Sequence, residues 1–341
     1  MLGYILAKNM PTVTIIVPCY NEQDTIGLLL SAIYSQTYPR AMIDVVVSDG
    51  MSTDGTREEI EKFQEKYNDI DIQIVDNPQR NIPSALNRAL EVAKAEIIIR
   101  LDAHSVPYVD YVARCVNALR DGKGDNVGGV WIIRTKGKGL LARSIMVAAS
   151  HPLGVGGAQY RIGGIAQPVD TVPFGAFYRS LIERVGMFDE SLLSNEDYEF
   201  NTRIRKIGGT IWFDPEIQST YFARSDIPAL AKQYWRYGYW KFRMLKRYPD
   251  TLRWRQGLPP LFVAGFIIFS ALAIVFPWIQ WLLLAQVCIY SLILLISGLL
   301  VAIKNHDPGL VVGVPMAISV MHLSWGLAFI WSLISSPFNR D

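Results

Sequence analysis

Hydrophobic and polar positions divide the chain into two stretches of different character. Up to about residue 225, short apolar runs alternate with amphipathic segments. From Leu258 to Ser336 the chain is almost continuously apolar, and its only formal charges are Lys304 and Asp307. Alternating strands and helices are typical of a sheet covered by helices, whereas a long uncharged stretch is typical of membrane-spanning helices. The pattern therefore predicts one strand–helix part and one membrane part.

The first part contains several strand–helix repeats. Short, mostly β-branched runs predict strands at Val13–Pro18, Ile43–Ser48, Ile72–Val75 and Glu96–Leu101. Amphipathic segments between them predict helices over Asp24–Ser35, Thr53–Tyr67 and Ser84–Ala95. We therefore expect an α/β fold with a mostly parallel sheet and helices on both faces. Ligands bind such sheets at the carboxyl ends of the strands.

The apolar part is long enough for three membrane-spanning helices, since one span needs about 20 residues. We expect spans at about residues 261–278, 279–303 and 310–334. Trp278 and Trp331 lie near the expected ends, as aromatic residues of the membrane–water interface do. His322 lies inside the third span, where we expect a neutral hydrogen bond between helices.

Basic residues set the expected orientation in the membrane. The segment 226–257 is rich in Lys, Arg and aromatic residues, which is typical of an interfacial helix on the cytoplasmic side. Residues 1–10 contain no long apolar run of a signal peptide. We therefore expect a cytoplasmic catalytic domain at 1–225, an interfacial region at 226–257 and a membrane domain at 258–341. The expected location is the plasma (inner) membrane, crossed several times, with the C-terminus outside.

Composition and missing motifs exclude several classes of protein. The formal net charge of +2 argues against a nucleic-acid partner. Three widely spaced cysteines argue against a disulfide framework or a zinc knuckle. The sequence also lacks the glycine-rich motifs of Rossmann dehydrogenases and P-loop NTPases and the serine elbow of α/β hydrolases.

Three polar clusters follow the predicted strands, at residues 18–22, 48–56 and 100–104. The first contains a tyrosine, whose ring can stack on a nucleobase, and the second contains carboxylates that can accept a base N–H. In the third, Asp102 and His104 offer an oxygen and a nitrogen ligand to a divalent metal between two phosphates. Such clusters at successive strand ends predict a nucleotide site.

These clusters, together with Asn195–Glu199, resemble the motifs of family 2 glycosyltransferases of the GT-A fold, in order over about residues 12–240. The stretches 100–104, 126–129, 154–158, 169–179 and 195–205 are similar to the succinoglycan-type membrane glycosyltransferases of bacterial exopolysaccharide assembly. The resemblance implies a nucleotide-diphospho-sugar transferase domain followed by transmembrane helices.

The resemblance implies a site for a nucleotide sugar, with UDP favoured, formed by Pro18, Tyr20, Glu22, Asp49 and Asp102. Tyr20 and Asp49 correspond to the family residues that hold the base. The metal motif of the family reads Asp-x-Asp, whereas this chain has a histidine in the last position, at His104. The implied cofactor is a divalent metal, Mn²⁺ or Mg²⁺, on Asp102 and His104.

The implied catalytic pair is Glu196 and Asp197, with Asp197 as the general base of an inverting transfer. Gly175 and Ala176 resemble the segment that lines the acceptor pocket of the family. Gln233 and Arg236 resemble the Gln-x-x-Arg-Trp signature of membrane-bound members, with tyrosine in place of tryptophan. They are therefore expected to bind the acceptor or a diphosphate.

The expected activity is transfer of a sugar, glucose from UDP-glucose by preference, to a polyprenyl-diphosphate-linked saccharide in cell-surface polysaccharide or glycan assembly. Two alternatives remain open: a polyprenyl-phosphate sugar synthase, which uses the lipid phosphate as acceptor, and a catalytically silent, membrane-anchored scaffold that binds sugar nucleotides. The amphipathic segment 139–161 is compatible with a helix at the membrane edge and with an ordinary core helix.

Overall fold

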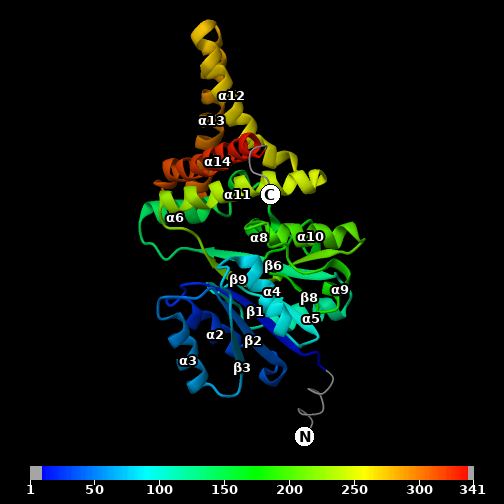
Figure 1. Cartoon of the computed structure of the whole chain (residues 1–341). Helices are drawn as coiled ribbons and strands as arrows, with labels where there is room; N and C mark the ends of the chain where they lie inside the picture. The colour runs from blue at the N-terminus through cyan, green and yellow to red at the C-terminus, as the bar shows by residue number, and fades with distance from the viewer. Residues whose placement is uncertain (1–9, 337–341) are drawn as a thin grey trace. The chain divides into compact units, whose positions relative to one another are not determined.

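The computed structural model describes residues 10–336, which form two compact units (Figure 1). The first unit comprises the residues up to Ile132 and Ile162–Tyr221, and the second comprises Ile133–Arg161 and the residues from Phe222 onward. The strand–helix part is therefore interrupted. Residues 133–161 fold with the second unit, although the sequence pattern places them in a continuous domain 1–225.

One mixed sheet is the centre of the first unit, with strands in the order β3-β2-β1-β4-β8-β6-β9-β5 and β7 beside β9. The strands are β1 (Val13–Cys19), β2 (Ile43–Asp49), β3 (Asp71–Asp76), β4 (Ile97–Arg100), β5 (Ser105–Pro107), β6 (Asn126–Arg134), β7 (Gln167–Pro168), β8 (Ala176–Tyr178) and β9 (Ile211–Phe222). Strands β3, β2, β1 and β4 are parallel. Strand β8 runs antiparallel to both β4 and β6, so half of the sheet is not parallel.

The parallel half follows the predicted strand–helix alternation. Its helices are α2 (Ile26–Tyr34), α3 (Thr56–Lys66), α4 (Ile82–Val92) and α5 (Tyr111–Arg120). Alternate strand residues such as Ile15 and Val45 share one core with α2, α3 and α5, while α4 packs on β1 and β2 from the other face, because successive side chains of a strand point to opposite faces. Helices therefore cover both faces of the parallel half, which confirms the expected α/β fold with helices on both faces, although the whole sheet is mixed and not mostly parallel.

The strand–helix alternation stops after β4, where the connection to β5 is too short for a crossover helix. Parallel neighbours need a connection of about a dozen residues or more, usually a helix. Strand β5 follows β4 after only a tight turn, in which the Ser105 amide donates to the Asp102 carbonyl at 2.9 Å. The turn sends β5 to the far edge of the sheet, where it pairs antiparallel with β9. It also leaves Asp102 and His104 in the loop beyond β4.

The second unit contains three helices long and apolar enough to cross a membrane, as expected. They are α12 (Trp254–Val275), α13 (Ile279–Asn305) and α14 (Leu310–Ser335), joined by short turns. The amphipathic helix α11 (Ile227–Arg247) lies along α14, while α12 and α13 extend together away from them (Figure 1). Asp226 begins α11 by accepting the Ala229 amide at 2.8 Å.

The segment 139–161 packs against these helices. It forms α6 (Leu140–Ala148) and the short α7 (Pro152–Val155), and Ile145 of α6 shares a buried apolar cluster with Val314 and Ile318 of α14. His322 of α14 is 3.1 Å from the Tyr290 hydroxyl of α13 and 2.8 Å from the Leu153 carbonyl oxygen. The expected polar contact between helices is confirmed, and it also fixes α7.

Close packing of β6 on β9 gives a first testable prediction. A Cβ on Gly129 would lie 1.7 Å from the Ile217 carbonyl oxygen, so Gly129→Ala must displace a strand, at a cost of about 1–3 kcal/mol. Gly27 of α2 has no neighbour within 4 Å of such a Cβ, and Gly27→Ala should stabilise its helix by about 0.5–1 kcal/mol. Thermal unfolding of the detergent-solubilised chain measures both. An unchanged melting temperature for Gly129→Ala would contradict this packing.

Candidate active site

Strained backbone conformations occur in the loops that carry the predicted site residues. Asn21, Met51 and Arg80 follow β1, β2 and β3 with φ angles of 52°, 59° and 53°, and Phe174 and Asn195 have φ angles of 65° and 67°. Left-handed conformations of non-glycine residues are uncommon and cost about 1–3 kcal/mol each. Such strain clusters at functional sites because the surrounding structure imposes it. All five residues lie in or beside the motifs.

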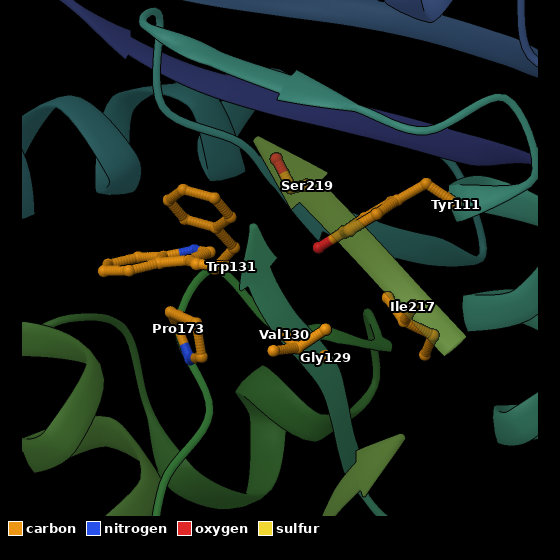
Figure 2. Close-up of a pocket in the computed structure, with 8 residues that line it drawn as sticks. Tyr111, Gly129, Val130, Trp131, Pro173, Ile217 and Ser219 are labelled. Atoms are coloured by element: carbon orange, nitrogen blue, oxygen red, sulfur yellow. The ribbon is translucent and has the colours of Figure 1, made fainter. Parts of the chain in front are cut away.

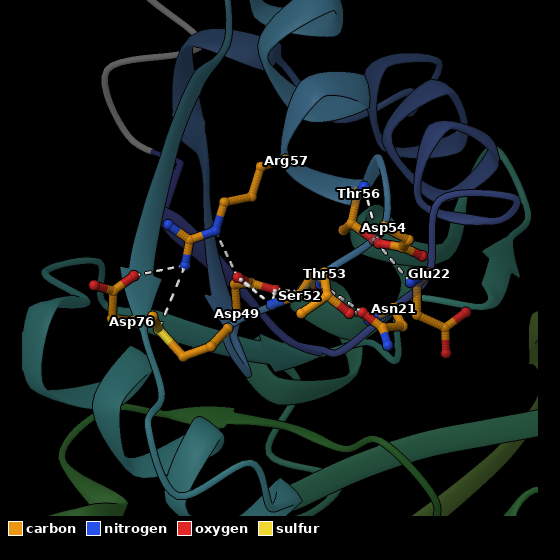
Figure 3. Close-up of polar contacts among 10 residues, drawn as sticks. Asn21, Glu22, Asp49, Ser52, Thr53, Asp54, Thr56, Arg57 and Asp76 are labelled. Atoms are coloured by element: carbon orange, nitrogen blue, oxygen red, sulfur yellow. Dashed lines mark hydrogen bonds and ion pairs between the residues drawn. The ribbon is translucent and has the colours of Figure 1, made fainter.

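The structure brings the first two polar clusters together (Figure 3). The Asn21 amide donates to the Ser52 hydroxyl at 2.9 Å, and the Thr53 amide donates back to the Asn21 side-chain oxygen at 2.9 Å. The Glu22 amide donates to the Thr56 hydroxyl at 2.8 Å. These bonds join the ends of β1 and β2 into one rigid loop pair.

Tyr20 and Asp49 occupy very different positions in this loop pair. Tyr20 is 44% exposed, and its side chain rests on Gly50, where a Cβ would come within 3.1 Å of it. Asp49 is fully buried. Its carboxylate tolerates burial because it accepts the Arg57 Nε–H at 2.6 Å and the Ser52 backbone amide at 3.1 Å. Pro18 lies within the buried strand β1. Tyr20 is therefore the accessible part of the predicted base site.

Arg100, the last residue of β4, connects three carboxylates. Its guanidinium is 2% exposed and forms ion pairs with Asp102 and Glu196, each at 3.0 Å, and with Asp197. Burial alone would lower the pKa of Arg100, but these carboxylates raise it above its usual range. A buried cation is tolerated when it is paired and hydrogen-bonded. The predicted metal motif and the predicted catalytic pair therefore meet at one side chain.

Asp197 is the more accessible of the two predicted catalytic acids. Its side chain is 26% exposed, against 8% for Glu196. Desolvation raises the pKa of Asp197 to about 7; the Arg100 charge opposes this rise, and the neighbouring Glu196 and Asp102 carboxylates add to it. A carboxyl group that titrates near neutral pH is suited to proton transfer.

Helix α10 (Glu196–Lys206) carries both acids in its first turn. Buried hydrogen bonds between side chains hold the helix in place. The Asn126 side-chain NH₂ donates to the Asn201 side-chain oxygen at 2.7 Å. The Asn201 side-chain NH₂ in turn donates to the Thr171 hydroxyl at 2.9 Å and to the Val172 carbonyl at 3.1 Å. Asn126 also lies against Gly175, where a Cβ would come within 2.5 Å of the Asn126 oxygen. Hydrogen bonds and close packing thus join helix α10 to the strained segment before β8.

His104 pairs with Glu22 across the site, with 3.0 Å between the imidazole Nδ1 and the carboxylate. Burial would raise the pKa of Glu22, but the hydrogen bonds and charge of His104 and the Thr25 hydroxyl outweigh burial and lower it. Among residues 10–336 no cluster of three or more His, Cys, Asp or Glu side chains is placed to hold a metal. Asp102 and His104 fit a divalent cation only as a partial set, which phosphate oxygens of a ligand would complete.

The predicted acceptor segment lies beside two stacked aromatic side chains, Trp131 and Tyr221. Trp131 stacks on Tyr221, with ring centroids 4.4 Å apart, and the Tyr221 ring is 6.5 Å from the imidazole of His104. A narrow crevice between β6 and β9 has no room for a water molecule, and Figure 2 shows the Tyr111 hydroxyl pointing into it. Gly175 has a φ of 76°, whereas Ala176 is fully buried in the core.

Gln233 and Arg236 lie on α11, in the second unit. The Gln233 side-chain amide donates to the Tyr237 hydroxyl at 3.1 Å. Tyr237 occupies the position where the family signature has tryptophan. The role of these residues in binding an acceptor stays a prediction.

Sequence reasoning did not single out Arg100 and Arg57, whose ion pairs join the carboxylates of the candidate site. The signal for Arg100 was present, because it is the only charged residue in the apolar run Ile97–Leu101, and a charge buried in a strand must be paired. No comparable signal marks Arg57, which lies in a polar amphipathic helix.

Comparisons with known proteins show which family and which proteins this chain resembles. The profile of glycosyl transferase family 2 matches residues 14–186. The succinoglycan biosynthesis protein ExoA of Rhizobium meliloti (strain 1021) is 31% identical over 92% of this chain and 93% of its own length. A dolichyl N-acetyl-α-D-glucosaminyl phosphate 3-β-D-2,3-diacetamido-2,3-dideoxy-β-D-glucuronosyltransferase of Methanococcus voltae is 29% identical over 95% of this chain and 98% of its own.

Solved structures share the fold at lower identity. The mannosyltransferase PcManGT of Pyrobaculum calidifontis, solved with GDP-Man and Mn²⁺, has a TM-score of 0.61 at 22% identity and covers 100% of this chain and 95% of its own. Residues 1–349 of Staphylococcus aureus TarS were solved in complex with UDP. Their TM-score is 0.50 at 14% identity, and the match covers 96% of this chain and 92% of the TarS chain.

Proposed function

Because the chain belongs to glycosyl transferase family 2, we propose that it transfers a sugar from a nucleotide sugar to a polyprenyl-diphosphate-linked saccharide at a membrane. Two relatives that align along nearly their full length support this assignment: one acts in succinoglycan biosynthesis and one is named for a sugar transfer to a dolichyl-linked sugar phosphate. The product would enter cell-surface polysaccharide or glycan assembly.

The observation that carries the proposal is the triple ion pair of Arg100. One guanidinium holds Asp102, on the side predicted for the donor, and Asp197, the predicted base. The distance between a leaving group and an attacking hydroxyl must be held closely for direct displacement. Arg100 is suited to keep the two carboxylates at a fixed separation because its planar fork is rigid and always charged.

In this proposal Asp197 takes the proton of the acceptor hydroxyl as its oxygen attacks the anomeric carbon. The bond from that carbon to the diphosphate oxygen breaks, and its electron pair leaves with the nucleoside diphosphate. No glycosyl-enzyme forms, so the configuration inverts. Glu196, nearly buried against Arg100, supports the position of Asp197.

The donor base would stack on Tyr20, with Asp49 and Glu22 nearby. We favour a UDP-sugar, UDP-glucose in particular, although the similar folds were solved with UDP and with GDP-Man. Asp102 and His104 would hold Mn²⁺ or Mg²⁺ together with the donor diphosphate. The cation would offset the charge that develops on the leaving group.

The second unit would hold the enzyme at the cytoplasmic face of the membrane and present the lipid acceptor. Helix α11 combines basic and aromatic residues, as interfacial helices do. We place the end of α14 on the outer side, because three candidate spans in the described part of the chain follow this basic flank. Gln233 and Arg236 are the candidates to bind the lipid diphosphate.

Nucleotide release by the detergent-solubilised chain tests the proposal. UDP-, GDP- and dTDP-sugars are supplied with Mn²⁺ or Mg²⁺, each with a polyprenyl-diphosphate saccharide, with polyprenyl phosphate or with no acceptor. We expect release that requires both metal and the diphosphate-linked saccharide. Release only with polyprenyl phosphate would instead support a lipid-phosphate sugar synthase. Donor binding without release in any mixture would support a scaffold.

The pH profile gives a second test, because a general base must be deprotonated to act. Since the pKa of Asp197 is raised to about 7, kcat/KM should rise with pH through neutrality and level off above it. Initial rates between pH 5.5 and 9 at saturating metal measure the profile. A rate that is constant over this range, or that falls as pH rises through 7, would contradict the assignment of Asp197.

A further inference from the structure

A basic side chain covers the buried carboxylate in the predicted base site. Asp49 and Asp76 are the last residues of adjacent strands and lie opposite each other in the register of β2 and β3. Arg57, in the first turn of α3, donates from Nε to Asp49 and from Nη2 to Asp76, both at 2.6 Å (Figure 3). Any flat ligand that approaches Asp49 from the surface therefore encounters this guanidinium.

An exposed aromatic ring and a second guanidinium lie near Arg57. Cys19 lies opposite Asp49 in the β1–β2 register, so the exposed Tyr20 adjoins the Asp49–Asp76 row. The Arg80 guanidinium is 5.8 Å from the centre of the Tyr20 ring. Arg57 is 34% exposed, and no hydrogen bond of its Nη1 is found within residues 10–336.

We propose that Arg57 selects the nucleobase of the donor by donating to a carbonyl oxygen on the edge of the base. The inference rests on the proposed function and names a specificity residue for it. A guanidinium has donors and no acceptor. It therefore favours uracil or guanine, which carry an oxygen at C4 or C6, over cytosine or adenine, which carry at the same ring position an amino group that also donates.

The two carboxylates give this side chain its orientation. The fully buried Asp49 fixes Nε, and the more exposed Asp76, at 59%, fixes Nη2. With two nitrogens held, the direction of the third is set before a ligand binds, which reduces the entropy lost on binding. Arg57 differs in this respect from Arg40, whose ion pair with Asp69 is exposed on both sides.

Binding of nucleoside diphosphates to the full chain in detergent with Mn²⁺ tests the inference, by calorimetry with UDP, CDP, GDP and ADP. Within each pair, UDP against CDP and GDP against ADP, the first base carries an oxygen at C4 or C6 (the carbonyl base) and the second an amino group there (the amino base). We expect the wild-type protein to prefer the carbonyl base of at least one pair by about 10-fold or more. Arg57→Met should lower the affinity for that diphosphate about 10–100-fold and change the affinity for the diphosphate of the paired amino base less than about 3-fold.

Two further variants separate base selection from support of the fold. Arg57→Lys keeps a cation between Asp49 and Asp76 and should retain the wild-type melting temperature while losing most of the preference. Arg40→Met removes an exposed ion pair and should leave the preference unchanged. If Arg57→Met lowered the affinity for all four diphosphates equally, the role of Arg57 in base selection would be overturned, while the donor site itself would stand. No binding of any diphosphate to the wild-type protein would overturn the donor site itself.

Discussion

Asp197→Asn is expected to lower kcat by about 10²–10⁴-fold while the donor binds as before, because a general base contributes rate of this size. Asparagine has nearly the same shape and keeps an oxygen for Arg100, so the ion-pair cluster changes little. It cannot accept the proton of the acceptor hydroxyl. Initial rates of nucleotide release give kcat, and calorimetry with UDP or GDP gives the affinity of the donor site.

Glu196→Gln is the matched comparison for this variant. Glu196 contacts the same guanidinium but its side chain is only 8% exposed, so an acceptor reaches it less readily than Asp197. We expect its kcat to fall less than that of Asp197→Asn. A larger loss for Glu196→Gln, or turnover of Asp197→Asn within a few-fold of the wild-type rate, would assign the base elsewhere.

Arg100→Met is expected to have the largest effect on folding, destabilising the first unit by about 3–5 kcal/mol. Methionine is similar in length, but it leaves Asp102, Glu196 and Asp197 without the buried charge that pairs with all three. The remaining carboxylates repel one another in a desolvated site. Thermal or urea unfolding of the detergent-solubilised chain measures the change.

Arg114→Met provides the control for removing an arginine. Arg114 pairs with Asp110 at 2.6 Å, and both side chains are 37% exposed. Exposed pairs contribute about 1 kcal/mol or less. Equal stability of the two variants would show that the Arg100 cluster is not a support of the fold. In that case its proposed role in spacing Asp102 and Asp197 would lose its basis.

The parallel half of the sheet and the chemistry at its strand ends could be predicted from the sequence. β-branched runs such as Val13–Cys19 and Ile43–Asp49 have few alternatives to buried strands, and polar residues follow each one. The antiparallel half was not predictable in the same way. Its strands β5, β7 and β8 are two or three residues long, which is too short for a periodic pattern.

The beginning of the first membrane helix also differs from the expected span for a physical reason. The expected span starts at about residue 261, just after Pro259 and Pro260, and prolines disfavour helix interiors in water. The helix instead begins at Trp254 and includes both prolines. Proline is tolerated in membrane helices, where neighbouring groups satisfy the freed backbone carbonyls.

The contacts that organise the site depend on long-range pairing, which a single sequence does not reveal. Arg100 and Asp197 are far apart in the chain, and their ion pair requires α10 to lie over the end of β4. The grouping of residues 133–161 with the membrane helices depends likewise on packing between α6 and α14, where Gly313 leaves room for Ser144. Local sequence patterns indicated the candidate site residues, and the fold determined which of them lie in contact.

The configuration of the newly formed glycosidic bond tests the central claim most directly. The product is isolated after incubation of the wild-type chain with its preferred nucleotide sugar, metal and polyprenyl-diphosphate saccharide. Mass spectrometry then shows whether one sugar has been added, and NMR gives the anomeric configuration. We predict a single added sugar with the configuration opposite to that of the donor. Retention of the donor configuration would contradict direct displacement with Asp197 as base.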